Sequence, residues 1–250
     1  MPRFFVTSGQ IENGIVTVTG DDARHLSRAL RMAVGDVITV CDMQRREYRC
    51  ELTDFLPDRV LGRVLDVSES QTEPPASITL YQALPKGDKL DSIIQKAVEC
   101  GVSRIVPFES ERCIVRCKPE AEAHKTERRA RIALEAAKQC GRGVIPQVLP
   151  TVSFSQMLHE AAEAQTVLFC YEGDGTKPLG TLLSQLPRQS TGKLAIVIGS
   201  EGGFSLSEAQ AAKDKGFLLA GLGPRILRTE TASGFALACI ACMLELGGLS

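Results

Sequence analysis

Short runs in which hydrophobic and polar residues alternate fill the first 70 residues of the chain. Four of these runs are rich in Val, Ile, Thr and Tyr and are separated by Gly, Asp and Pro: IVTVTG (15–20), DVITVCD (36–42), REYRCELTDF (46–55) and RVLGRVLDVS (59–68). This composition and partial alternation predict short β-strands. We therefore expect residues 1–70 to form a small β-barrel.

One stretch in this region, DDARHLSRALRM at 21–32, has a helical pattern instead. The two aspartates at its start are suited to cap a helix. Arg24, Arg28 and Arg31 follow at spacings of four and three. Residues at these spacings are neighbours on a helix surface, so the three guanidinium groups are expected to share one face.

From residue 77 onward, strand-like runs alternate with helical patterns. The strand-like runs are SITLYQAL (77–84), SRIVPFES (103–110), TVLFCYE (166–172), KLAIVIGS (193–200) and GFLLAGLG (216–223). Such alternation is typical of an α/β domain with a mostly parallel sheet. The stretch between the two regions has no apolar periodicity and contains a Pro pair, so we place a linker at 71–76 and the α/β domain at 77–250.

Three helices of this domain can be read from the sequence. The helix that begins at Lys89 and ends before Gly101 places its apolar residues on one face: Leu90, Ile93, Ile94, Ala97 and Val98. A second helical pattern covers about 126–140. The third, about 231–246, is apolar nearly all round and must therefore be buried on every side, either centrally or in a subunit interface. We favour an interface that packs partly against the same helix of a second copy.

Two glycine-containing turns follow strand-like runs. Residues 199–205 lead into a helix that is announced by a capping box, Ser205-x-x-Glu208. Residues 222–231 follow the last strand. Ligands of open α/β sheets bind at the carboxyl ends of the strands, where glycine turns leave backbone amides accessible. The alternative is a tight strand-to-helix turn without a ligand.

Two familiar glycine motifs are absent from the sequence: Gly-x-Gly-x-x-Gly at a strand-to-helix turn, and the P-loop pattern. Their absence argues against Rossmann dinucleotide binding and P-loop chemistry.

Composition and charge narrow the class of protein. The chain has 250 residues, 44% of them hydrophobic, and a net charge of -1, so any RNA-binding surface must be local. The N-terminus lacks a signal-peptide pattern, and no apolar run approaches the roughly 18 residues of a membrane span. We expect a soluble, cytoplasmic protein with reduced thiols.

The nine cysteines do not form a metal-binding pattern. Cys239 and Cys242 lie within the apolar last helix, and no second Cys or His pair follows at zinc spacing. Small buried side chains are the better interpretation, and we predict no metal.

Several longer motifs resemble those of a known family. They are PRFF, HLSRALRM, KGDKLDSIIQKAVECGVSRIVPFESERC, EAAKQCGR, GSEGGFSLSE and LGPRILRTETA, and they span essentially the whole chain. Together they resemble the ribosomal small-subunit RNA uridine-N3 methyltransferases of the SPOUT superfamily. One departure is Ser200, where that family commonly has Pro, and a Gly-Ser-Glu-Gly turn is frequent in related enzymes that methylate ribose.

The resemblance implies an architecture and a cofactor. The expected fold is α/β, with an N-terminal PUA-like β-barrel and a C-terminal SPOUT domain tied in a trefoil knot, and the expected assembly is a homodimer. S-adenosylmethionine would lie between the knot loops, with no metal. Its expected contacts are Glu172, Ile198, Gly199, Glu201, Gly202, Gly203, Leu222, Gly223, Arg225, Ile226 and Leu227.

The implied reaction is methylation of N3 of a uridine in 16S rRNA, and it sets requirements for catalytic residues. N3 is a weakly acidic imide whose anion is the competent nucleophile, so positive charge near its carbonyl oxygens favours reaction. Arg142 and Arg228, beside glycine-rich turns, are the candidates for that role. Glu230 could accept the proton or merely cap the last helix. Glu201 is either a brace of its loop or a partner of the cofactor's ammonium group.

Arginines are the candidates for contact with ribosomal RNA or the small subunit. Arg3, Arg24, Arg28 and Arg31 in the barrel come first, with Arg128 and Arg129 as weaker candidates, and the alternative is that they are solvated surface residues. Two other functions stay open. One is ribose 2'-O-methylation within the same superfamily, and the other is a non-catalytic RNA-binding factor in ribosome assembly.

Overall fold

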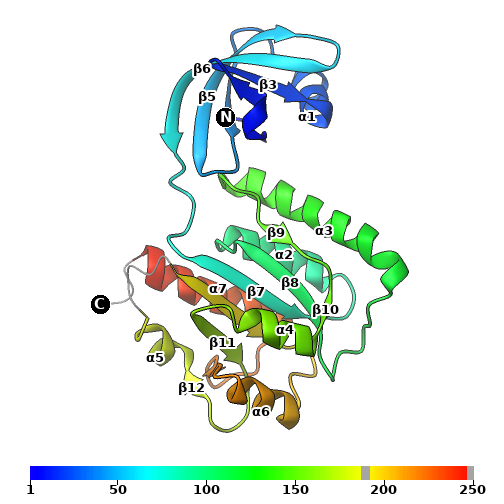
Figure 1. Cartoon of the computed structure of the whole chain (residues 1–250), viewed down its shortest axis with the longest axis vertical. Helices are drawn as coiled ribbons and strands as arrows, with labels where there is room; N and C mark the ends of the chain where they lie inside the picture. The colour runs from blue at the N-terminus through cyan, green and yellow to red at the C-terminus, as the bar shows by residue number, and fades with distance from the viewer. Residues whose placement is uncertain (187–191, 247–250) are drawn as a thin grey trace. The chain divides into compact units, whose positions relative to one another are not determined.

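The computed structural model describes residues 1–186 and 192–246, and the chain divides into two compact units (Figure 1). Unit 1 comprises Met1–Glu73 and Ala137–Ile145, and unit 2 comprises Pro74–Ala136 and Pro146–Ser250. A short segment from the middle of the chain therefore belongs to the N-terminal unit.

Unit 1 contains a six-stranded sheet with the order β1-β4-β5-β6-β3-β2. β1 pairs with β4 in parallel, and the other neighbours are antiparallel. The strands are β1 (Arg3–Phe5), β2 (Ile11–Glu12), β3 (Ile15–Thr19), β4 (Val37–Cys41), β5 (Arg46–Phe55) and β6 (Arg59–Glu69). The four strands expected from alternation are confirmed. β1 and β2 were not expected, because two or three residues are too few to show a periodicity.

The core of unit 1 lies on the inward-facing side of this sheet. Phe4, Ile38, Val40 and Leu52 are at most 1% exposed, and they alternate with outward-facing residues along their strands. Leu26 of the helical insert is fully buried in the same cluster. The insert thus covers one part of the core.

The helical insert differs from its expected form. A short α-helix, α1 (Gly20–Arg24), continues as a π-helical turn, η2 (His25–Ala29), and a 3₁₀ turn, η1 (Ser8–Gln10), precedes both. Arg31 lies beyond the helix with a left-handed φ of 51°. The prediction that Arg24, Arg28 and Arg31 share one helix face is therefore wrong for Arg31, because the regular helical repeat ends before that residue.

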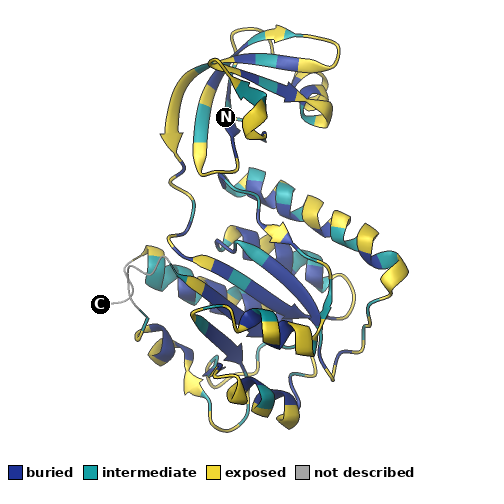
Figure 2. Cartoon of the chain, in the orientation of Figure 1, coloured by how far each residue is buried: buried dark blue, intermediate teal, exposed yellow. Residues whose placement is uncertain are grey.

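Unit 2 is built on an eight-stranded sheet. Its order is β10-β8-β7-β13-β11-β14-β12, with β9 paired to β8, and every pairing is parallel. The strands are β7 (Ser77–Ala83), β8 (Arg104–Glu109), β9 (Gln147–Val148), β10 (Val152–Ser153), β11 (Thr166–Cys170), β12 (Lys177–Pro178), β13 (Lys193–Ile198) and β14 (Leu218–Gly221). The predicted α/β class with a mostly parallel sheet is confirmed. Figure 2 shows the central strands of this sheet mostly buried.

The helices connect these strands. They are α2 (Lys89–Glu99), α3 (Pro119–Cys140), α4 (Phe154–Ala161), α5 (Leu179–Leu183), α6 (Leu206–Asp214) and α7 (Thr229–Glu245). In Figure 1, α4 lies in front of the sheet, with α2 and α7 behind it. The five apolar residues expected on one face of α2 are all buried. α3 begins seven residues before the expected position, and α6 has the expected capping box.

α7 is buried on one side only. Ala236, Leu237 and Ile240 are fully buried in the face that packs against α2 and β13. Thr231, Phe235 and Ala238 form an open strip along the helix, in which Phe235 is 42% exposed. In the single chain the helix is therefore not buried on every side, which disfavours a central position. The favoured alternative, a subunit interface, stays a prediction.

None of the nine cysteines, all of which lie in the described residues, is part of a disulfide. Within residues 1–186 and 192–246, no helix combines the length and the apolar character needed to cross a membrane.

Candidate functional site

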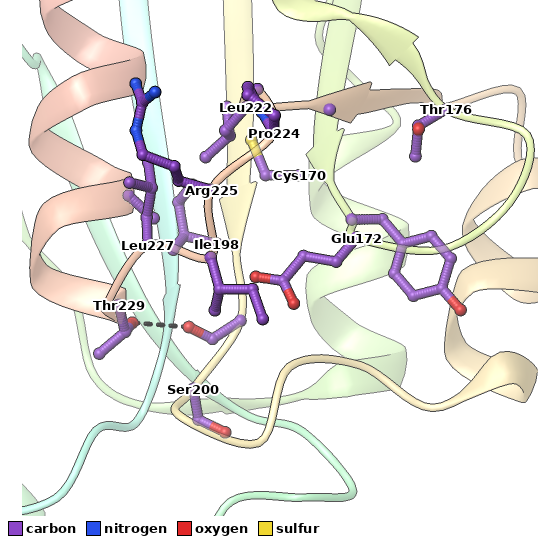
Figure 3. A pocket seen from close by; sticks show the side chains of 16 residues that line it. Cys170, Glu172, Thr176, Ile198, Ser200, Leu222, Pro224, Arg225, Leu227 and Thr229 are labelled. Atoms are coloured by element: carbon purple, nitrogen blue, oxygen red, sulfur yellow. Dashed lines mark hydrogen bonds between the residues drawn. The ribbon is translucent and has the colours of Figure 1, made fainter.

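Two cavities open at the carboxyl ends of β11, β13 and β14. Because these strands are parallel, their last residues, Cys170, Ile198 and Gly221, reach the same edge of the sheet. The cavities have volumes of about 220 and 650 Å³ and share lining residues, including Glu172, Gly199 and Leu227 (Figure 3). Such a position is where α/β sheets bind ligands.

The glycine turn after β13 forms the floor of both cavities. The amide of Gly203 donates to the carbonyl oxygen of Ser200 over 2.9 Å, and Gly203 has a left-handed φ of 61°. A Cβ atom on Gly199 would lie 3.2 Å from Gly203 and from the ring of Phe204. Both positions therefore favour glycine, one for its backbone conformation and one for close packing.

A buried polar cluster joins this turn to the neighbouring elements. Gln82, fully buried at the end of β7, donates from Nε2 to Thr229 Oγ1 over 2.9 Å, and Thr229 Oγ1 donates to the carbonyl oxygen of Gly199 over 2.6 Å. Figure 3 draws this last hydrogen bond as a dashed line. The cluster ties β7, the glycine turn and the start of α7 together.

Glu201 braces the glycine turn against the segment before α2. Its carboxylate accepts from the amide of Lys86 and from Lys89 Nζ, the latter over 2.7 Å. Burial alone would raise the pKa of Glu201, but these donors, led by Lys89, outweigh it and lower the pKa below its usual value. This geometry supports the brace rather than a free partner for a ligand.

Two of the three catalytic candidates lie at the start of α7. Arg228 is exposed there and lines the larger cavity, whereas Glu230 lines neither cavity. The buried Oε2 atom of Glu230 lies 3.6 Å from Lys89 Nζ, which is an ion-pair distance but too long for a hydrogen bond. This oxygen therefore has a cation beside it but no hydrogen-bond donor among the described residues, so it is able to accept from a substrate.

Arg142 has different surroundings, within unit 1. Its guanidinium donates from Nε and Nη2 to the carboxylate of Glu73 over 2.9 and 2.7 Å, and both side chains are 4% exposed. Glu73 also accepts from the amides of Gly143 and Val144. Arg142 thus organises the turn that follows α3.

The arginines considered for RNA contact fall into two groups. Arg28 and Arg31 are exposed and have no ion-pair partner among the described residues. The others are engaged: Arg3 with Glu47, Arg24 with Asp21, Arg128 with Asp91, and Arg129 with Glu122. The Arg129 pair is largely buried, which makes that side chain the poorest candidate.

All the residues expected to contact the cofactor line one or both cavities. The smaller cavity is lined by Glu172, Ile198, Gly199, Leu222, Gly223, Arg225, Ile226 and Leu227, and the larger one adds Glu201, Gly202 and Gly203. The structure also brings in residues that the sequence reading missed. Ser200 and Thr229 line both cavities, and Arg112 of the loop after β8 donates to the carbonyl oxygen of Gly202 over 3.0 Å.

Gln82 was missed as well, although the sequence contains a signal for it, because it is a polar residue near the end of an otherwise apolar strand. Ser200, Thr229 and Arg112 have no comparable signal. The segments that the structure describes contain no group of three or more His, Cys, Asp or Glu side chains able to hold a metal ion.

Comparison with known protein families identifies the class of protein to which the chain belongs. Residues 72–241 match the RNA methyltransferase domain, and residues 18–65 match the RNA methyltransferase PUA domain. The fold and site therefore belong to the class of RNA methyltransferases.

Individual relatives define the family. Ribosomal RNA small subunit methyltransferase E of Bacillus subtilis is 35% identical, with 98% of each chain covered. The crystal structure of ribosomal RNA small subunit methyltransferase E from Neisseria gonorrhoeae bound to S-adenosyl methionine is 32% identical, covers 97% of this chain and 98% of its own, and superimposes with a TM-score of 0.82. The chain belongs to the ribosomal RNA small subunit methyltransferase E family.

Proposed function

We propose that this protein is an S-adenosylmethionine-dependent enzyme that methylates N3 of a specific uridine in the 16S rRNA of the small ribosomal subunit. The observation that carries the proposal is the pair of cavities at the sheet edge, which all the residues expected to hold the cofactor line. Membership of the family supports the reaction class. The cofactor bound in the Neisseria gonorrhoeae relative supports the methyl donor.

The residues around the cavities fit S-adenosylmethionine. Ile198, Leu222 and Leu227 offer apolar side chains to a purine ring, and the glycine turn offers backbone amides. Ser200 is 7% exposed, and its buried Oγ has no hydrogen-bond partner among the described residues, so it is available to a polar ligand atom. When bound, the cofactor would supply an electrophilic methyl group on a positively charged sulfur.

The protein's own residues would position the uridine and handle its proton. Glu230 would accept the proton of N3 at Oε2, the atom that lies 3.6 Å from Lys89 Nζ and makes no hydrogen bond among the described residues. Arg228, at the mouth of the larger cavity, would stabilise the negative charge that develops on the base oxygens. The buried pair with Glu73 supports a structural role for Arg142 in place of the catalytic one.

Nucleoside analysis after methyl transfer tests this proposal. Purified protein is incubated with methyl-labelled S-adenosylmethionine and small subunits from cells that lack the activity. Label in 3-methyluridine is the expected result. Label in a ribose-methylated nucleoside would favour the alternative raised by Ser200, and no label despite demonstrable cofactor binding would favour a non-catalytic RNA-binding role.

The proposal includes an architecture and an assembly. We propose that the sheet of unit 1 closes into a PUA-like barrel within residues 1–70, that 71–76 is a linker, and that 77–250 forms a SPOUT domain with a trefoil knot. The resemblance of the motifs supports these points. The open strip of Thr231, Phe235 and Ala238 on α7 supports a homodimer, and cysteines outside any disulfide suit a cytoplasmic protein.

A further inference from the structure

Glu172 lies on a fixed piece of backbone at the end of β11. The amide of Tyr171 donates to the carbonyl oxygen of Ala220 over 3.0 Å, which extends the pairing of β11 with β14. The ring of Tyr171 packs so closely over Gly173 that a Cβ there would lie 2.4 Å from it. The turn that carries Glu172 is therefore held on both sides.

The carboxylate of Glu172 points into the cavities. It lines both of them, and Figure 3 shows it directed toward Ile198, between the end of β11 and the glycine turn. No hydrogen bond or ion pair engages it within the described residues. Its negative charge is thus available to a ligand.

None of the other charged groups around the cavities forms an ion pair with Glu172 within the described residues. Glu201, the second acid, is paired with Lys89. Arg112 donates to Gly202, and Arg228 is exposed at the mouth of the larger cavity. The guanidinium of Arg225 runs along α7, away from Glu172 (Figure 3). The unpaired carboxylate of Glu172 therefore favours a positively charged ligand group at its own position in the cavity.

We infer that Glu172 determines specificity for the sulfonium form of the cofactor over the neutral product. Methyl transfer breaks the S–CH₃ bond and leaves its electron pair on sulfur, so the positive charge on sulfur disappears while the ammonium and carboxylate groups are unchanged. A carboxylate close to the sulfur would therefore hold the reactant more tightly than S-adenosylhomocysteine and favour product release. This inference rests on the proposed function, because it takes S-adenosylmethionine as the ligand.

Calorimetric titration of Glu172→Gln tests the inference. Three ligands are compared: S-adenosylmethionine, S-adenosylhomocysteine, and sinefungin, which carries a protonated amine near the position of the sulfonium. We expect the variant to bind the two cationic ligands about fivefold more weakly than wild type, a loss of about 1 kcal/mol that is appropriate for a partly exposed charge pair. Affinity for S-adenosylhomocysteine should stay within about twofold.

Asp174→Asn is the matched control, because this acid lies on the same turn but lines neither cavity. It should leave all three affinities unchanged. An equal loss for all three ligands in Glu172→Gln would overturn the inference, since it would indicate a structural role or contact with the ammonium group. Unchanged binding of all three would overturn it as well. If wild-type protein bound none of the ligands, the proposed function itself would be at fault.

Discussion

The ion pair between Arg142 and Glu73 gives a prediction at the scale of single residues. Both side chains are 4% exposed, and the two hydrogen bonds between them are 2.9 and 2.7 Å long. Removing one member of such a pair leaves an unpaired buried charge, which typically costs about 3–5 kcal/mol. We expect Arg142→Ala to lower the free energy of unfolding by that amount in urea titration.

Arg131→Ala is the control for this prediction, because Arg131 lies on α3, the helix that precedes Arg142, with 71% of its side chain exposed and paired weakly with Glu127. It should change stability by less than about 0.5 kcal/mol. An Arg142→Ala protein that unfolds like wild type but has lost methyl transfer would contradict the structural role and restore the catalytic one.

The sequence indicates which residues come together where their position depends on local geometry. The cofactor candidates follow strands that end at one sheet edge, so their order in the chain already indicates that they meet. The sequence does not reveal the pairing of Arg142 with Glu73, because Glu73 lies 69 residues away and no local pattern links the two. The partners of Arg3 and Arg129 are distant in the same way.

The cluster of Gln82, Thr229 and Gly199 gives a prediction at the scale of elements, since it joins β7, the glycine turn and α7. Thr229→Val removes both hydrogen bonds of this hydroxyl, each worth about 0.5–1.5 kcal/mol, so the expected cost is about 1–3 kcal/mol. Gln82→Leu should cost a similar amount. Because the two residues share one network, the double variant should lose less than the sum, with a coupling of about 0.5–3 kcal/mol in a double-mutant cycle. Additive losses would show that the elements are not coupled here.

Elements with a regular period were predictable, and those that depend on neighbours were not. The apolar face of α2 follows from its spacing alone. The open strip on α7 could not be predicted, because an all-apolar helix does not reveal which side packs against its own chain. The π-helical turn of η2 could not be predicted either, because the arginine spacings fit an ordinary α-helix equally well.

Arg28 provides a prediction at the scale of the whole molecule, where charge governs RNA binding. The net charge is -1, so binding depends on local arginines. Arg28 is exposed without an ion-pair partner among the described residues, whereas Arg3 is paired with Glu47. We expect Arg28→Ala to lower the slope of log affinity against log salt by about 0.7–0.9 in filter binding with 16S rRNA. Arg3→Ala should change it less, and equal slopes for Arg28→Ala and wild type would remove Arg28 from the interface.

The dependence of stability on pH is a second property of the whole molecule. Burial raises the pKa of the Cys41 and Cys50 thiols to about 11, above the ordinary value of 9.0. A raised pKa in the folded state means that stability is fully present below pH 9 and is lost as the pH rises toward 11. We expect the free energy of unfolding, measured by urea titration, to fall over this interval by about 1–3 kcal/mol for each thiol. Cys50→Ala should show a shallower fall, and an identical fall would exclude that thiol as a source.

Assembly is the last property to depend on the whole chain. Phe235 is 42% exposed on the open strip of α7, next to Thr231 and Ala238. Burial of an aromatic side chain contributes about 1.5–3 kcal/mol, so a charge at its centre should disrupt a dimer that uses this strip. We expect wild type to elute as a dimer, and Phe235→Asp as a folded monomer, in size exclusion with light scattering. Ile114→Asp, at a residue that is 71% exposed elsewhere in unit 2, should remain dimeric. A dimeric Phe235→Asp protein would place the interface on another surface, because a buried carboxylate facing its own copy could not be accommodated without a partner.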